Sequence, residues 1–146
     1  VANSFFVNIP CSQEFSKTQL SNPMFKNLWG LNNFGQDDSK GNTGRKGIDI
    51  QALDAWDISK GSHDIVVAVI DTGIDTTHED LSANIWTNEA EANGKPNIDD
   101  DKNGYVDDIY GWNFANNNSN PKTYSTSNHG THVAGVIGAN RGNGQG

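Results

Sequence analysis

Two residues whose side chains act together in acid–base chemistry stand at well-defined places in this 146-residue sequence. Asp71 directly follows an unbroken apolar run over residues 65–70, and His129 directly precedes a segment rich in small and apolar residues over 130–139. The carboxyl end of a buried strand is where open parallel sheets place their ligands and their chemistry. A carboxylate that orients an imidazole makes that imidazole an effective general base. We therefore predict that Asp71 and His129 lie side by side as a catalytic pair.

A second candidate site is the acidic segment over residues 99–108, which has the spacing of an EF-hand-type calcium loop through its first nine positions. Oxygen-bearing groups and a glycine occupy the required positions, and these residues are Asp99, Asp101, Asn103, Gly104, Tyr105 (through its carbonyl) and Asp107. The twelfth position is Tyr110 rather than glutamate, so the bidentate ligand must be another residue, with Asp108 and Glu91 as candidates. Because so many carboxylates repel one another without a dication, calcium is favoured over a merely solvated acidic loop.

The elements that would position these residues follow from the hydrophobic pattern. Residues 65–70 are apolar and mostly β-branched, the pattern of a strand buried on both faces in a parallel sheet. Helices are predicted over about 49–59 and over 130–139, and a short strand near 110–114. The rest of residues 84–128 is predicted to be loop. In the second helix, the residues expected to pack inward are Val133, Val136 and Ile137.

Composition excludes several classes of function. The chain has 10 basic and 18 acidic residues and a net charge of −8, which argues against a nucleic-acid partner. No apolar run approaches the roughly 20 residues of a membrane span. The length fits one domain better than two. The single cysteine, Cys11, excludes an internal disulfide and is either a small apolar residue or the partner of a cysteine outside this chain.

The tripeptide Asp71-Thr72-Gly73 also fits an aspartic protease, in which two such carboxylates share a proton. That fold is all-β, and it gives no account of the predicted helix over 130–139. The aspartic-protease interpretation is therefore the weaker one.

Two longer motifs resemble those of the subtilisin-like serine proteases (subtilases). The segment 67–75, followed by His78 and by Asp80-Leu81, is similar to their aspartate motif, and the segment 129–135 is similar to their histidine motif. The resemblance implies a three-layer α/β sandwich around a mostly parallel sheet. It also implies a serine endopeptidase in which Asp71 is the orienting acid, His129 is the general base and His132 is structural. Residues 28–146 would then be the N-terminal part of the catalytic domain, and residues 1–27 an N-terminal extension or surface arm.

The family's serine motif and its oxyanion-hole asparagine are absent from these 146 residues. We therefore expect this chain to be incomplete and inactive by itself, with the nucleophilic serine supplied by a C-terminal portion that stays bound after a break beyond Gly146. The rival interpretation is a calcium-binding protease homologue that has lost catalysis.

The resemblance further implies a second calcium site, in which Asp80 pairs with the loop over 140–146 through Asn143 and the carbonyl of Gln145. It also implies protein or peptide substrates, a propeptide as a further candidate partner, and a secreted or lumenal location.

Overall fold

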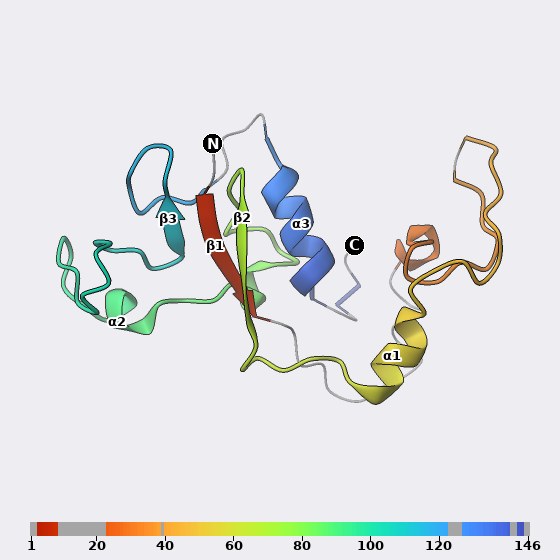
Figure 1. Ribbon diagram of the computed structural model, residues 1–146, viewed down its shortest axis with the longest axis horizontal. Helices are drawn as coiled ribbons and strands as arrows, with labels where there is room; N and C mark the ends of the chain where they lie inside the picture. The colour runs from red at the N-terminus through yellow and green to blue at the C-terminus, as the bar shows by residue number, and fades with distance from the viewer. Residues whose placement is uncertain (1–2, 9–22, 39, 123–126, 141–142, 145–146) are drawn as a thin grey trace. The chain divides into compact units, whose positions relative to one another are not determined.

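The computed structural model describes residues 3–8, 23–38, 40–122, 127–140 and 143–144 (Figure 1). The chain divides into two compact units. The first unit joins residues 1–10 to residues 62–140, and the second contains residues 11–61 and 141–146. Both members of the predicted catalytic pair belong to the first unit. The predicted boundary between residues 27 and 28 stays a prediction.

Three strands of the first unit form one sheet in the order β2-β1-β3 (Figure 1). Their bounds are Asn3–Asn8 for β1, Val66–Asp71 for β2 and Gly111–Asn113 for β3. The strands expected at 65–70 and near 110–114 are therefore confirmed. Residues 3–8 differ from the expectation of a surface arm, because they form the central strand and pair with a neighbour on each side.

The pairing within this sheet is antiparallel, in contrast to the mostly parallel sheet that we expected. Asn3 lies opposite Asp71 on one side and opposite Asn113 on the other. Among the described residues, the parallel pairing is an isolated bridge between Ile74 and Lys122. Strand β1 lies between β2 and β3 and runs opposite to both of them. The first unit contains helices as well as strands.

Strand β2 is buried on one face rather than on both. Val69 is buried in the core, and the half-buried Val67 packs against that core. The alternate residues Val66 and Ile70 are 42% and 70% exposed. The prediction of burial on both faces is thus wrong for the described chain, because α3 packs on one side of β2 only.

Helix α3 (His129–Gly138) covers the buried face of the sheet beside β2 and β1 (Figure 1). The fully or nearly buried residues of this core are Val7, Val69, Ile74, Leu81, Ile85 and Ala134. Val133 and Ile137 pack against it as predicted. Val136 does not, since it is 76% exposed on the opposite side of the helix.

The remaining elements of the first unit are short. The 3-10 helix η3 (Ser82–Asn84) and the helix α2 (Glu89–Ala92) precede the acidic segment. Asn84 is buried, and its side-chain amide donates to the carbonyl of Gly138 at 2.8 Å. This bond connects the C-terminal end of α3 to η3.

The second unit contains the 3-10 helix η2 (Phe25–Asn27) and the helix α1 (Ala52–Ile58). Helix α1 confirms the helix predicted over about 49–59, with one turn lost at its start. Gln51 adopts a left-handed conformation at φ 52°, which prevents the helix from beginning earlier.

Candidate active site

Asp71 is the last residue of β2, and its carboxylate is held by the turn that follows. The backbone N–H of Thr72 donates to Oδ1 of Asp71 at 2.7 Å. The carbonyl of Thr72 accepts a hydrogen bond of 3.2 Å from the buried side-chain amide of Asn3. The central strand β1 therefore fixes the turn that presents the carboxylate.

His129, the first residue of α3, meets this carboxylate although it lies 58 residues further along the chain. Its Nδ1 is 2.8 Å from Oδ1 and 2.9 Å from Oδ2 of Asp71. The Asp71 side chain is 17% exposed, whereas the His129 ring is 69% exposed. With Nδ1 engaged by the carboxylate, Nε2 is the ring nitrogen through which His129 would exchange a proton with another group.

The hydrogen bond from His129 holds the pKa of Asp71 below its ordinary value of 3.8, and the N–H of Thr72 lowers that pKa further. Both donors stabilise the carboxylate form. Asp71 therefore stays ionised under mildly acidic conditions, as an orienting acid must.

Two threonines and a pair of glycines bring helix α3 against the turn after β2. The N–H of Gly130 donates to Oγ1 of Thr72 at 3.0 Å, and the N–H of Asp75 donates to Oγ1 of Thr131 at 3.0 Å. A Cβ on Gly130 would overlap the carbonyl oxygen of Gly73. The histidine can reach Asp71 only because the first turn of its helix carries no side chain at that point.

Two other histidines, His78 and His132, belong to the two motifs. His78 accepts a hydrogen bond of 3.1 Å at Nδ1 from the N–H of Asp80, and its carbonyl accepts the N–H of Leu81. It therefore shapes the turn before η3. His132 is exposed on α3, and its structural role stays a prediction.

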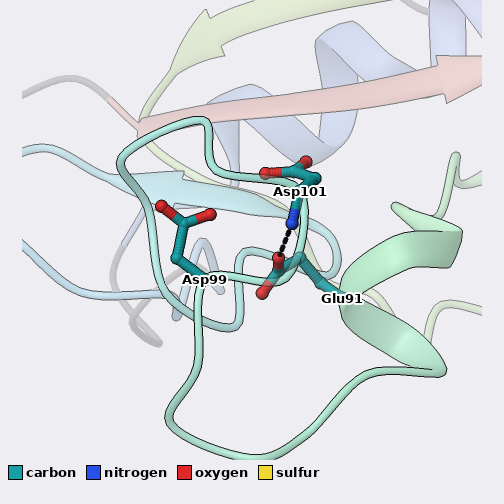
Figure 2. A group of neighbouring side chains, drawn as sticks. All are labelled: Glu91, Asp99 and Asp101. Atoms are coloured by element: carbon teal, nitrogen blue, oxygen red, sulfur yellow. Dashed lines mark hydrogen bonds between the residues drawn. The ribbon is translucent and has the colours of Figure 1, made fainter.

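The acidic segment is organised around Glu91, which is buried at 4% exposure. Its Oε1 accepts the N–H of Asp100 at 2.7 Å and that of Asp101 at 3.1 Å, and its Oε2 accepts the N–H of Asp107 at 2.8 Å. Figure 2 shows the carboxylates of Glu91, Asp99 and Asp101 gathered in the loop. One ligand oxygen from each lies within 4.8 Å of the others. This is an all-oxygen donor set, which fits a hard cation such as calcium.

Two further predicted ligands, Asn103 and Asp108, belong to the same cluster. Side-chain amides connect its carboxylates. The amide of Asn103 donates to Asp101 at 3.0 Å and to Asp108 at 3.1 Å. The buried amide of Asn88 donates to the same two residues at 2.8 and 3.0 Å. Burial raises the pKa of Asp108, and the neighbouring charges of Asp101 and Glu91 raise it further. A cation here would relieve that repulsion.

Three other predicted ligands are Asp107, Asp80 and Asn143. The carboxylate of Asp107 accepts the N–H of Asn97 at 2.9 Å, on a separate loop segment. Asp80 belongs to the first unit and Asn143 to the second, so their pairing stays a prediction. Gln145 and Cys11 lie outside the described residues.

The sequence patterns did not indicate three residues that shape the two sites, namely Asn3, Thr72 and Asn88. For Thr72 the available signal is its position next to Asp71. Asn3 and Asn88 gave no local signal, because each acts through a partner distant in the sequence.

None of the helices in the described part of the chain is both long and apolar enough to cross a membrane.

The sequence model of the subtilase family matches residues 62–146, more than half of the chain. Subtilisin-like protease 1 of Plasmodium berghei (strain Anka) is 38% identical over 133 residues, which cover 90% of this chain and 20% of that protein. Subtilisin-like protease 1 of Plasmodium falciparum (isolate 3D7) is 46% identical over 96 residues, 64% of this chain and 14% of that protein. The thermophilic serine proteinase of Bacillus sp. (strain AK1) is 36% identical over 92 residues, 63% of this chain and 17% of that protein.

The chain thus spans about a fifth or less of the length of these curated relatives. The matched region contains the contact between Asp71 and His129, and the relatives are named as proteases from both a bacterium and protozoa. We conclude that this chain belongs to the subtilase family of serine peptidases.

Proposed function

We propose that this chain supplies two members of an Asp-His-Ser triad for the hydrolysis of peptide bonds. The observation that carries the proposal is the contact between Nδ1 of His129 and the carboxylate of Asp71 at 2.8 and 2.9 Å. The serine would come from a C-terminal portion outside residues 1–146. Family membership favours this serine mechanism over the aspartic-protease alternative.

In this mechanism His129 accepts, at Nε2, the proton of the serine hydroxyl as the serine oxygen attacks the substrate carbonyl carbon. The same nitrogen then returns the proton to the leaving amine, and a water molecule hydrolyses the acyl-enzyme in the reverse sense. Asp71 remains ionised and stabilises the imidazolium that forms. It also fixes the tautomer in which Nδ1 carries the hydrogen.

The finer fold that we propose is a three-layer sandwich with a mostly parallel sheet. Its support is the exposed apolar side chains on the face of β2 that α3 leaves uncovered, Val66 and Ile70. Further strands and helices of the same domain would cover them, since an apolar strand with one bare face gains free energy when that face is buried.

We also propose that the acidic segment binds calcium. The residues that would hold the ion are Glu91, Asp99, Asp101, Asn103 and Asp108, with the Tyr105 carbonyl and Asp107 as further candidates. Asp80 with Asn143 is the candidate pair for a second site. Bound calcium would supply positive charge to a region where burial and like charges already raise the pKa of Asp108.

Protein or peptide substrates, a propeptide and a secreted or lumenal location complete the proposal. The family supports all three. The proposed calcium site adds support for the location, since weak calcium sites are occupied in compartments that are rich in calcium.

A fluorophosphonate probe on the complete protein tests the triad. We expect the serine to be labelled in the wild type and in H63A, a control at an exposed histidine, and labelling to fall by at least about 10³-fold in H129A. Equal labelling of H129A and wild type would contradict the proposed base. A complete protein without labelling would instead be the non-catalytic homologue, and inhibition by pepstatin would revive the aspartic protease.

Calorimetric titration of the EDTA-treated complete protein with calcium tests the metal site. We expect binding heat in the wild type and in D57N, which changes an exposed carboxylate on α1, and weaker binding in D101N. An isotherm without heat in the wild type would contradict both calcium proposals.

A further inference from the structure

We propose that Thr72 is a positioning residue, which sets the contact between Asp71 and His129 because its backbone N–H bonds to the strand end while its hydroxyl group bonds to the helix start. This inference rests on the proposed triad and adds to it a residue that acts through the acid and the base.

Thr72 contacts both sides of the pair. On the strand side, its backbone N–H donates to Oδ1 of Asp71 at 2.7 Å. On the helix side, its Oγ1 accepts the N–H of Gly130, the residue after His129, at 3.0 Å. One residue is therefore bonded to the acid and to the peptide group next to the base.

The two bonds use different groups of Thr72. A hydroxyl oxygen has lone pairs that accept, and the one of Thr72 accepts from the helix, while the backbone N–H of the same residue donates to the carboxylate. The position of one residue is thus tied to the carboxylate and to the first turn of α3.

The His129 ring needs such a device because it is 69% exposed and gains little orientation from packing. Its placement depends on the carboxylate in front of it and on the backbone of α3 beneath it. A shift of about 1 Å between an acid and a base costs on the order of 100-fold in rate, because proton transfer requires close alignment.

The other strand-to-helix tether differs in this respect. Thr131 accepts the N–H of Asp75 at 3.0 Å and so also holds α3 against the turn. That bond ends on a backbone group rather than on the catalytic carboxylate. Thr131 therefore restrains only the position of α3, whereas Thr72 is bonded both to α3 and to the carboxylate of Asp71. The buried Asn3 in turn restrains Thr72 through its carbonyl.

The test compares T72V, which is similar in shape but lacks the hydroxyl, with T72S, which keeps it. Thr77→Val is the matched control, because it removes an exposed threonine hydroxyl that bonds to Asp75 at 2.7 Å, away from the pair. The complete protein is assayed on a peptide substrate, and the Asp71 carboxyl is titrated by carbon-13 NMR.

We expect T72V to lower kcat by about 10- to 100-fold with KM nearly unchanged, since alignment for proton transfer is lost while substrate contacts remain. Its Asp71 titration midpoint should rise toward 3.8, because a displaced helix start weakens the hydrogen bond from His129, which is the largest cause of the lowered pKa. T72S should restore both readouts to near wild-type values, and T77V should change neither. If T72V fails to fold, T72A makes the same comparison with less steric demand.

Wild-type kcat and an unshifted Asp71 midpoint in T72V, beside an inactive H129A, would overturn the role of Thr72 alone. Equal activity of wild type and H129A would overturn the proposed triad instead.

Discussion

Nδ1 of His129 contacts both oxygens of Asp71 at almost equal distances, 2.8 and 2.9 Å, so the carboxylate holds this ring nitrogen from two sides. The side chains of Asp71 and His129 differ in how exposed they are and in how many groups hold them. Asp71 is largely covered and also held by Thr72, whereas the ring projects toward solvent. Asp71 is therefore the more restrained side chain of the pair, and the exposed His129 ring is held by its hydrogen bonds to that carboxylate.

The first prediction at this scale concerns the pH dependence of that pair. Because the folded-state pKa of Asp71 lies below 3.8, the folded protein binds fewer protons there than the unfolded chain does. The stability contributed by the pair is thus present above about pH 3.8 and is lost as the pH falls through the lowered folded-state pKa. Carbon-13 NMR of the Asp71 carboxyl should give a midpoint below 3.8 in the wild type and in H63A.

In H129A the largest cause of the shift is removed, so the midpoint should move up toward 3.8. Thermal unfolding should then lose part of its pH dependence in the acidic range. A midpoint in H129A that equals that of the wild type would show that another donor holds the carboxylate.

At the scale of elements, the close approach between α3 and the turn after β2 is what allows the two side chains to meet. Gly73 has φ 112°, a conformation that L side chains rarely adopt, and its carbonyl faces Gly130. Hydrogen bonds at Thr72 and Thr131 secure the helix start, and Asn84 secures its end. The helix is thus fixed at both ends to the segment that carries Asp71.

Two glycines of the same helix give a matched prediction. G130A should destabilise the protein by about 1–3 kcal/mol, since the new Cβ overlaps the carbonyl of Gly73 and the helix must shift. G135A should be neutral or more stable by up to about 1 kcal/mol. Nothing lies within 4 Å of a Cβ there, and alanine is the better helix former.

Chemical denaturation of both variants, with fluorophosphonate labelling as a second readout, checks this pair. G130A should also lose labelling, because a displaced helix start separates His129 from Asp71. Equal stability of the two variants would show that the approach of helix and turn is not a constraint.

At the scale of the whole molecule, the acidic segment is the region in which charge opposes folding. The chain carries a net charge of −8, and Glu91 of α2 lies close to Asp101 and Asp108 of the loop that follows. Backbone and side-chain amides already satisfy these carboxylates, but they do not neutralise them. A ligand that binds only the folded loop stabilises the whole protein by mass action.

We therefore expect calcium to raise the melting temperature of the complete EDTA-treated protein. The gain is about 2.7 kcal/mol when free calcium is about 100-fold above its Kd. D101N should show a smaller rise than D57N, and magnesium a smaller rise than calcium, because its preferred geometry is stricter. A melting temperature that does not respond to calcium would contradict a structural role for the ion.

The amino-acid sequence alone determined the chemistry-bearing residues and the local elements. Asp71 at a strand end, His129 at a helix start and the spacing of the acidic loop are local features, because residue type and hydrophobic periodicity act over a few positions. Tertiary structure decided the rest. The central place of residues 3–8, the exposed face of β2 and the hydrogen bond from Asn88 to Asp101 depend on partners far apart in the sequence, which no local pattern encodes. The contact between acid and base spans 58 residues, and it exists because one glycine lets a helix start come close enough to a strand end for a hydrogen bond.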